Sequence, residues 1–597
     1  MYFAQHTEVS RSRDMITSFG GYNHKLSCAD GEFFDMKNMT SSYYPILSPR
    51  NQRGICYQMT DPQGIIDKEY LVWVDDGKLY RNGVELTLAE GVTISKEENM
   101  CPKTLAKMGA YLIIMPDKVW YNMDNHESGW IEATATNTGS VFISVSATNG
   151  TTIQWHDEAY YEKNAPKSGD YCMTTSSGKP VLKQWAESTS MWVTVTSTYI
   201  QMVSDGIGKG LKAGDGVKIL VDNSTAKWDY CDNLFINDEG DNKWSLNTTI
   251  EECGDNYITF VGLIGEVKEF STFPVTVTRS CPDMAFITEC NNRLWGCSTD
   301  GHEVYCCKLG DVTNWNCFKG ISTDSWVATI GSDGKFTGAV TYLGYPTFFK
   351  ENSILKIAVS STGGHQTKET YCRGVQRGSE KSLCIMNEVL FYKGTTDVCA
   401  YDGSLPQSIS SSLGEVRYSD AVGGTIGDRY YISMKDKEGK SHLFVYDYSR
   451  GIWTKEDNTD VRFFCTNGDE LYYIDNADKK LKSVRGTLPF SGGETEKDFW
   501  WSAESGTVGY ATPDNKYIAR VSIRLSMEFG TNVDFYIQYD SSGEWEHQFN
   551  LNGKGTKSFA VPVHPRRCDH FKYKITGRGG CKIYSVSKTI EEGSEIV

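Results

Sequence analysis

Long hydrophobic runs are missing from this sequence. The segment "AYLIIM" (110–115) is among the longest apolar stretches, and the first 18 residues hold no apolar core of signal-peptide length. A helix that spans a membrane needs about 20 mostly apolar residues. We therefore expect no membrane insertion by this chain and expect it to be made in the cytoplasm.

Positive charge and paired cysteines are also scarce. Sixty basic side chains face 76 acidic ones, for a formal charge of −16, and the 18 cysteines include no CxxC pair. Diffuse attraction to nucleic-acid phosphates needs the opposite charge balance, so tight DNA binding is not expected. Without paired ligands at short spacing a zinc site is not expected, and the cysteines are predicted to be mostly reduced, buried thiols.

No catalytic signature emerges from the motifs. "EGKSH" (438–442) resembles the end of a phosphate-binding loop but has Met434 in place of the earlier glycine, and "DGIGKGLKAGDG" (205–216) precedes no helical pattern. Both segments are predicted to be turns. Because no nucleophile–base pair, metal cluster or cofactor fingerprint is found, the prediction is a protein without cofactor or metal that is not an enzyme.

What the sequence has in abundance is short aromatic and β-branched runs joined by glycine turns. Each such unit is predicted to be a β-hairpin, and the units recur roughly every 35–55 residues, which suits the four-stranded blades of a propeller. We predict an all-β protein built on a β-propeller of about six or seven blades. Examples are "YLVWVDDGKLYRNG" (70–83), "YLIIMPDKVWYN" (111–122) and "EVLFYKGTTDVCAYDG" (388–403).

Changes in texture along the chain predict its domains. A stretch of short strands with Gly-Asp turns interrupts the blade pattern, and clean apolar–polar alternation near the carboxyl end predicts a half-buried antiparallel sheet. The only helical window is 95–108. The predicted division is an extended arm over 1–55, a propeller over 56–133 and 285–484, an inserted β-barrel or sandwich over 134–284, a linker over 485–497 and a β-sandwich over 498–597.

One basic patch interrupts the acidic background, at "HPRRCDHFKYKITGRGG" (564–580). Alternation places its bases on one face of a strand. The patch is either an edge strand guarded by lysines or an electrostatic contact with an acidic neighbouring subunit, with nucleic acid as a third reading. The candidate residues here are Arg566, Arg567, Lys572 and Lys574.

The segment "SFGGYNHKLSCADGEFFDMKNMTSSYYPILSPRNQRG" (18–54) carries a family resemblance. It resembles the amino-terminal motif of bacteriophage tail hub, or nozzle, proteins, in which "GYN" or "GLN" precedes "GE", an asparagine, and a final leucine and arginine before a glycine. The later phrases "NRLWG", "FFKENSILKI", "YDGSLPQSIS", "YYISMKD", "LFVYDYSRGIWTKED" and "PRRCDHFKYKITGRG" also look like that family, in the same order. The matching positions are Gly21, Tyr22, Asn23, Gly31, Glu32, Asn38, Leu47, Arg50 or Arg53, and Gly54.

The resemblance implies a structural virion protein, located in the phage tail and assembled in the host bacterial cytoplasm. Related proteins form a homo-oligomeric ring, usually of six copies, below the portal and adaptor proteins. The ring lines the channel for the genomic DNA, helps to retain the packaged genome without sequence-specific binding, and carries fibres or spikes. No enzyme activity comes with the family, and an acidic channel surface would let DNA slide.

Residues 19–54 are predicted to lie extended along the propeller, with aromatic side chains as anchors. The alternative function is a tail-associated carbohydrate-binding or glycoside-cleaving β-propeller, and a scaffold propeller that binds proteins in its funnel is a third possibility. The predicted anchors are Tyr22, Phe33, Phe34, Tyr43 and Tyr44, and the remaining interaction candidates in this segment are Asn23, Glu32, Asn38 and Arg50.

Overall fold

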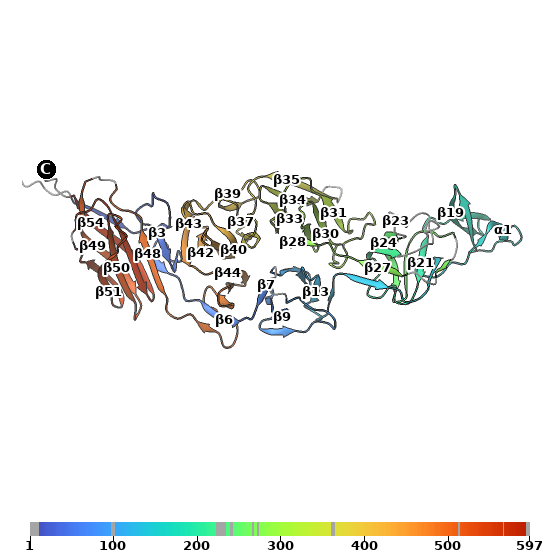
Figure 1. Ribbon diagram of the computed structural model, residues 1–597, viewed down its shortest axis with the longest axis horizontal. Coiled ribbons are helices and arrows are strands. Elements are labelled where there is room, and N and C mark those ends of the chain that lie inside the picture. The colour runs from blue at the N-terminus through green and yellow to red at the C-terminus, as the bar shows by residue number, and fades with distance from the viewer. Residues whose placement is uncertain are drawn as a thin grey trace, which may run out of the picture.

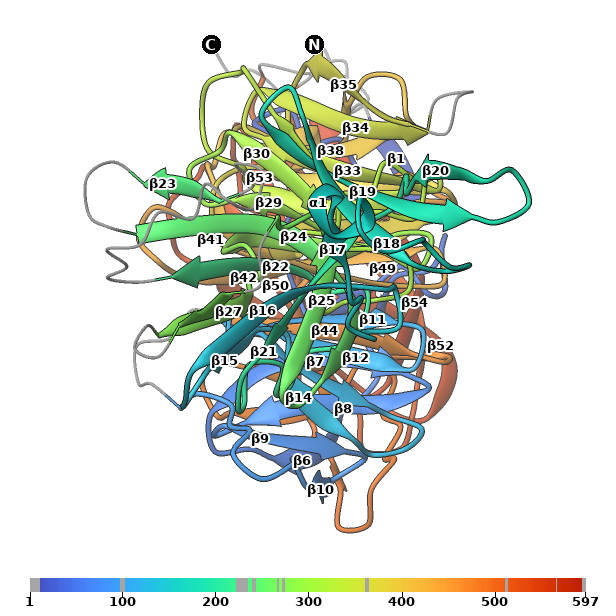
Figure 2. The ribbon, with the colours of Figure 1, turned by 90° about the vertical axis from the view of Figure 1, so that its right-hand side faces the viewer.

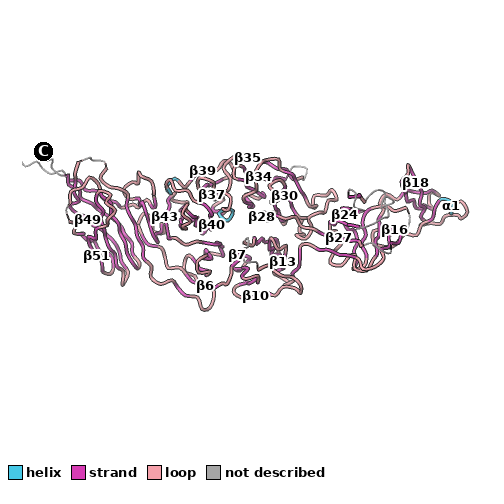
Figure 3. The backbone as a smooth tube through the Cα atoms, viewed as in Figure 1, coloured by secondary structure: helices cyan, strands magenta, loops and turns pink. Residues whose placement is uncertain are grey.

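The computed structural model describes residues 11–96, 102–221, 235–238, 243–265, 268–270, 274–359, 364–510, 514–564 and 566–592. The molecule is elongated and has three parts in a row (Figure 1): a β-sandwich, a β-propeller and a projecting inserted domain. Strands account for most of its regular structure, and the few helices are single turns (Figure 3). None of the helices in the described part of the chain has the length or apolar character to cross a bilayer.

Within the described residues the propeller consists of six four-stranded antiparallel sheets and a seventh, five-stranded sheet, whose fifth strand is β47 (Glu494–Thr495). The hairpins predicted from the sequence form these sheets, because each pairs neighbouring strands through a short turn. In chain order the sheets are β7 (Pro62–Lys68) to β10 (Val84–Leu86) with β8 (Tyr70–Asp75) and β9 (Lys78–Arg81); β11 (Thr104–Met108), β12 (Tyr111–Met115), β13 (Val119–Asn122) and β14 (Ser128–Trp130); β28 (Met284–Glu289), β29 (Leu294–Ser298), β30 (Glu303–Cys306) and β31 (Trp326–Thr329); β32 (Gly338–Tyr342), β33 (Tyr345–Lys350), β34 (Ser353–Val359) and β35 (His365–Tyr371); β36 (Cys384–Met386), β37 (Val389–Lys393), β38 (Val398–Tyr401) and β39 (Gln407–Ser408); β40 (Ser419–Ile426), β41 (Arg429–Lys435), β42 (Ser441–Asp447) and β43 (Ile452–Asp457); and β44 (Val461–Asn467), β45 (Glu470–Asp475), β46 (Lys480–Ser483) and β6 (Gly54–Gln58).

The first strands of these sheets form a closed circle. Contacts join β7 to β11, β11 to β28, β28 to β32, β36 to β40, β40 to β44 and β44 back to β7, while the 3₁₀ turn η1 (Glu380–Ser382) lies between β32 and β40. The seventh sheet takes its fourth strand, β6, from the amino-terminal segment, so that Gly54 pairs with Ser483. The two ends of the propeller chain are therefore fastened to each other by a strand ladder.

The inserted domain leaves the propeller after β14 and returns at β28. Its larger sheet curls around one apolar cluster, and a smaller sheet with the one-turn helix α1 (Glu158–Tyr161) forms the far tip, which faces the viewer in Figure 2. The larger sheet contains β15 (Ala133–Thr136), β16 (Val141–Ser146), β21 (Tyr199–Val203), β22 (Gly216–Val221), β23 (Ile236–Asp238), β24 (Lys243–Gly254), β25 (Tyr257–Val261), β26 (Lys268–Phe270) and β27 (Val275–Arg279); the tip contains β17 (His156–Asp157), β18 (Tyr171–Ser176), β19 (Lys179–Ala186) and β20 (Met191–Thr194).

The sandwich is built from both ends of the chain. Its side chains share one apolar cluster with the propeller, in which Ile575 of the sandwich belongs to the same core as Phe444 and Trp453 of the β40–β43 sheet. The sandwich and the propeller are thus joined by a continuous core. One sheet has the order β1 (Arg11–Ile16), β54 (Cys581–Glu592), β49 (Lys516–Met527), β52 (Gly555–Val561), and the other β2 (Gly21–Tyr22), β3 (Glu32–Lys37), β48 (Trp500–Ser505), β53 (Phe571–Arg578), β50 (Asn532–Tyr539), β51 (Glu546–Asn552).

The structure corrects the prediction of an extended arm over 1–55. The segment does contact the propeller strand β43 through β2, β3 and β4, but it is no extended arm. Its described part supplies β1 and β3 to the sandwich, pairs β4 (Met39–Thr40) with β5 (Ser48–Pro49), and ends in β6 of the propeller. The edges of β54 and β48 hydrogen-bond to these strands, which an extended arm packed only by side chains would leave unpaired. Strand β47 (Glu494–Thr495), within the predicted linker, likewise pairs with β6.

Three further predictions are wrong in detail. Residues 104–108 of the predicted helix form strand β11, because they pair with β12, while 97–101 lie outside the described residues. Strand β53 is no edge strand, since it pairs with β48 on one side and β50 on the other. Tyr43 and Tyr44 are 42% and 40% exposed in the turn between β4 and β5, so they do not anchor the segment as Tyr22 and Phe33 do.

Candidate functional site

Three of the residues that carry the family resemblance meet at one place, where the amino-terminal segment crosses from the sandwich to the propeller. Asn38, Arg50 and Arg53 come from the segment, whereas their acidic partners come from the end of β43 and from the connector before β48. We call this cluster the joint. Its members are Asn38, Arg50, Arg53, Glu456, Asp457 and Glu496.

Asn38 sets the turn between β3 and β4. Its backbone lies in the left-handed region, with φ of 54°, which asparagine tolerates better than most residues. The side-chain amide donates to the Trp500 carbonyl at 2.8 Å, and its oxygen accepts from Arg50 Nε at 2.8 Å. One buried side chain thus ties the segment to the sandwich strand β48 and to the first arginine of the joint.

The two arginines are both buried and satisfy different carboxylates. Arg50 binds Glu496 through both terminal nitrogens, at 2.7 and 3.0 Å, and its guanidinium lies 4.0 Å from the centroid of the Phe499 ring. Arg53 donates to Glu456 at 2.5 Å and to Asp457 at 2.8 Å. Such charge-assisted, bidentate pairs fix geometry as well as charge, so the joint is a rigid connection.

The charges of the joint shift the acidity of its carboxyls. Burial alone would raise the pKa of Asp457, but the nearby Arg53 guanidinium and hydrogen bonds from Thr459 outweigh it and lower this pKa to about 2. Burial would also raise the pKa of Glu496, and Arg50 lowers it instead. Both carboxyls are therefore charged at neutral pH and serve as ion-pair partners.

The first half of the motif forms a second clasp next to the joint. The Asn23 amide donates to Glu32 at 2.5 Å, and the same carboxylate accepts from the Ala29 backbone at 2.9 Å, which closes the turn between β2 and β3. Gly21 has φ of +83°, and a Cβ there would overlap the Trp453 carbonyl oxygen. Tyr22 is buried, and its ring lies 5.4 Å from that of Phe444 in the propeller.

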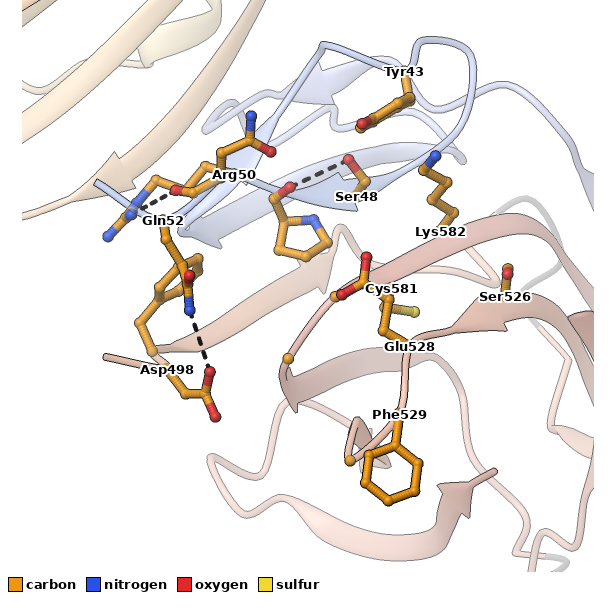
Figure 4. Close-up of a pocket in the computed structure, with 16 residues that line it drawn as sticks. Tyr43, Ser48, Arg50, Gln52, Asp498, Ser526, Glu528, Phe529, Cys581 and Lys582 are labelled. Atoms are coloured by element: carbon orange, nitrogen blue, oxygen red, sulfur yellow. Dashed lines mark hydrogen bonds between the residues drawn. The ribbon is translucent and has the colours of Figure 1, made fainter. Parts of the chain in front are cut away.

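A cavity of about 460 Å³ opens beside the joint, between the amino-terminal segment and the sandwich (Figure 4). Figure 4 shows side chains from the two sources converging on it: Tyr43 and Arg50 from the segment, and Asp498, Glu528 and Lys582 from the sandwich. We call it the junction pocket. It is lined by Tyr43, Ser48, Pro49, Arg50, Asn51, Gln52, Asp498, Phe499, Ser526, Glu528, Phe529, Gly530, Gly579, Gly580, Cys581 and Lys582.

Strand ends and glycines place the acidic side of this pocket. Glu528 follows β49 and its backbone donates to the Gly580 carbonyl at 3.0 Å. The Glu528 carboxyl lies over Gly580, where a Cβ would have to displace it. Burial, with the Glu528 charge as the second cause, raises the pKa of the neighbouring Cys581 thiol to about 12.

A second cavity, of about 400 Å³, lies at the centre of the propeller among first strands such as β7, β11, β40 and β44. Apolar side chains and two cysteines line it, together with Lys381, whose ammonium lies 4.2 Å from the centroid of the Phe463 ring. Burial lowers the pKa of Lys381 to about 8; the Glu380 carboxylate opposes this and the Arg462 charge adds to it. The lining thus combines apolar side chains with two cysteines, two threonines and one weakened cation.

The basic patch forms part of the sandwich surface. Lys572 and Lys574 lie on the face of β53 opposite its buried residues, and their ammonium groups lie 4.9 Å from the Phe34 ring centroid and 5.3 Å from that of Trp545. Arg566 pairs with Glu546 at 2.8 Å, and Arg567 is exposed next to it. These residues are not part of the joint, so the structure divides the predicted candidates into two groups.

Sequence reasoning missed the acidic half of the joint and most of the junction pocket. Glu456 and Asp457 lie about four hundred positions from Arg53 along the chain, and no spacing rule connects them. Phe529 and Glu528 stand in an ordinary turn sequence. Of the residues that line the pocket, the interaction candidates predicted from the sequence include Tyr43 and Arg50. Among the residues that the structure describes, no cluster of three or more His, Cys, Asp or Glu side chains could hold a metal ion.

Comparison with known proteins finds no matching family model and no matching curated protein. Solved structures with a likeness include Hsv2 from Kluyvelomyces marxianus, at 10% identity and a TM-score of 0.22, which covers 37% of this chain and 66% of that one, just under two thirds of its length. An exo-beta-1,3-galactanase from Phanerochaete chrysosporium matches at 10% identity and a TM-score of 0.16, over 50% of this chain and 92% of the other.

The extracellular domain of a putative hybrid two component system from B. thetaiotaomicron matches at 7% identity and a TM-score of 0.16, over 93% of this chain and 98% of the other. At these identities and scores the likenesses carry no argument about function. The propeller rests on the strand pairing of this chain itself.

Proposed function

We propose that this chain is a structural subunit of a bacteriophage tail, a hub or nozzle protein that assembles into a ring of six copies around the DNA exit channel. The observation that carries the proposal is the convergence of the motif residues Asn38 and Arg50 on the joint. There they fasten the amino-terminal segment to the sandwich and, through Arg53, to the propeller. Motif residues that form a rigid connection suit a virion protein that bears mechanical load better than they suit a ligand-binding loop.

Exposed apolar side chains on the propeller are suited to contacts between subunits. The fourth strand of several sheets carries one on the rim of the molecule, including Val84 in β10, Val327 in β31 and Tyr371 in β35. Large exposed apolar groups at a strand edge are costly in a free monomer and are typical of protein–protein interfaces. The formal charge of −16 fits a channel that DNA passes without adhering.

The alternative is a tail-associated propeller that binds or cleaves carbohydrate at its centre. A glycosidase needs two carboxylates that face each other across the bound sugar. The central cavity instead presents Lys381 among apolar side chains and thiols. This composition favours the structural reading over cleavage at the propeller axis.

In this proposal the partners are the portal and adaptor proteins above the ring and the fibres or spikes attached to it. The chain works in the virion tail after assembly in the host cytoplasm, retains the packaged genome and inserts into no membrane. Native mass spectrometry of the purified chain tests the proposal, with six-copy particles as the expected result. A stable monomer that releases reducing sugars from polysaccharide would overturn it.

A further inference from the structure

The junction pocket contains hydrogen-bonding groups that the protein itself leaves unused. Among the described residues, the Glu528 carboxylate makes no hydrogen bond or ion pair, and the Lys582 ammonium makes only a contact 3.9 Å from the Tyr43 ring centroid. Glu528 is exposed and Lys582 is half-buried, so both groups are accessible to a ligand. They come from neighbouring strands, since β49 pairs with β54, and offer an acceptor and a donor to one space.

The backbone that carries these groups is fixed before any ligand arrives. The Gly580 carbonyl accepts from the Glu528 backbone at 3.0 Å and from Thr531 Oγ1 at 2.9 Å, and Trp501 Nε1 donates to the Gly579 carbonyl at 3.0 Å. These bonds hold the two turns that border the pocket. A site whose backbone is already ordered loses less entropy when it binds.

Aromatic rings border the same space. Phe529 is 89% exposed at the rim, and Tyr43 is 42% exposed above Lys582. Nothing in the folded monomer explains a phenylalanine held almost entirely in water. The faces of such rings carry negative potential and attract the weakly positive C–H face of a sugar ring.

The lining discriminates among ligand classes. An anionic ligand would meet the carboxylates of Asp498 and Glu528, and a cationic one would meet Lys582 and Arg50. A wholly apolar ligand would leave the Glu528 carboxylate and the Lys582 ammonium without a partner, which costs free energy. Arg50 and Asp498 are already paired, with Glu496 and Arg578. A neutral molecule with many hydroxyls avoids all three penalties, because each hydroxyl both donates and accepts.

We propose that the junction pocket binds a neutral saccharide, one or two rings of a surface polysaccharide, with Tyr43 and Phe529 against its apolar face. Glu528 and Asp498 accept from its hydroxyls, and Lys582 donates to its oxygens. Gln52, whose amide already donates to Asp498 at 3.4 Å, orients that carboxylate. The volume of about 460 Å³ falls within the range of small-molecule sites.

Binding itself does not depend on the phage assignment, whereas its use, to hold a tail on a polysaccharide coat, rests on the proposed function. The pocket lies at the sandwich end of the molecule, opposite the inserted domain (Figure 1). A ring of copies would present this site several times. Weak single-site affinity would then add up to stable attachment.

The test uses the full chain on an array of neutral hexose, N-acetylhexosamine and uronic-acid oligosaccharides, followed by calorimetry with the strongest neutral probe. Glu528→Ala and Phe529→Ala should each weaken binding by roughly ten- to a hundredfold, as expected for a lost charged hydrogen bond or aromatic contact. Met191→Ala removes another strongly exposed apolar side chain, on β20 at the tip of the inserted domain, and should leave the affinity unchanged. Unchanged melting curves for all three variants would show that the fold survives.

Several results would overturn the proposal. These are no saccharide binding, a preference for uronic acids over neutral sugars, or binding that survives both pocket variants. Protection of the 526–530 turn by a neighbouring copy in hydrogen exchange would make the pocket a subunit interface instead. Such protection would refute the saccharide site but leave the proposed ring intact. A monomer that binds sugar would instead refute the ring and leave the pocket assignment standing.

Discussion

Removal of the Arg53 guanidinium should loosen the connection between the amino-terminal segment and the propeller. In the substitution Arg53→Met the stem of the side chain is kept, but the ion pairs to Glu456 and Asp457 and the hydrogen bond to the Tyr473 hydroxyl at 3.1 Å are lost. Glu456 is buried, and the nearest remaining cation is Arg50, whose Nε lies 3.8 Å from its carboxylate. The variant therefore leaves the buried Glu456 carboxylate with one long ion-pair contact, to Arg50.

The expected cost is about 3–5 kcal/mol, the usual range for breaking a buried pair by removing one partner. Since a chain with three parts does not unfold in one step, the local opening free energy is the quantity to measure. Native-state hydrogen exchange of peptides that cover β6 and β43 reports it. Exchange there should accelerate by roughly two to four orders of magnitude, while peptides from the inserted domain remain unchanged.

Arg566→Met is the matched control, because it breaks an ion pair of similar length, 2.8 Å, between side chains that are both about half exposed. Its expected cost is below about 1 kcal/mol. The double variant Arg53→Met with Glu456→Gln removes the stranded charge and should recover part of the loss. Equal effects of Arg53→Met and Arg566→Met would refute the view that the joint holds the segment in place.

The remaining predictions concern pH, the central cavity and the amino-terminal segment. Since the folded pKa of Asp457, about 2, is below its ordinary value of 3.8, its stabilisation of about 2 kcal/mol is present above pH 3.8 and lost as pH falls toward 2; Asp457→Asn should flatten this part of the exchange profile of β43. The folded pKa of Lys381, about 8, is below the ordinary 10.5, so Lys381→Met should stabilise the propeller by up to about 3 kcal/mol below pH 8, with a gain that fades by pH 10.5 in denaturant titrations; equal curves at pH 7 would contradict this. Gly21→Ala should lower the melting temperature of the sandwich in calorimetry, because its Cβ would overlap the Trp453 carbonyl oxygen, and an unchanged melting curve would count against the clasp. Deletion of residues 1–53 should abolish ring assembly in size-exclusion chromatography and microscopy, since β54 and β48 lose their neighbouring strands; rings formed by the truncated chain would show that the segment is dispensable.

Local patterns in the sequence were sufficient for much of the fold. The hairpins at 70–83 and 111–122 could be predicted because turn and strands are contiguous, and the alternation of Phe571, Tyr573 and Ile575 correctly indicated one buried face. The pairings of β1 with β54 and of β6 with β46 could not. They join positions more than four hundred residues apart, and such long-range register leaves no trace in a local pattern.

The candidate site, like the fold, could be predicted from the sequence only in part. Asn38 and Arg50 were found through a motif, yet their roles depend on Glu456 and Glu496, which only the folded chain brings near them. Tyr43 was predicted as an anchor because aromatic residues are usually buried in such segments, but the turn between β4 and β5 holds it at the surface. Surface exposure of a turn residue depends on the strands around it.

Cryo-electron microscopy of the purified chain with its portal and adaptor proteins tests the central claim most directly. We predict a ring of six copies below the adaptor, with an open channel on the axis and the exposed outer strands β31 and β35 buried between neighbouring propellers or against an attached fibre. A chain that stays monomeric and binds neither portal nor adaptor would contradict the assignment to the tail.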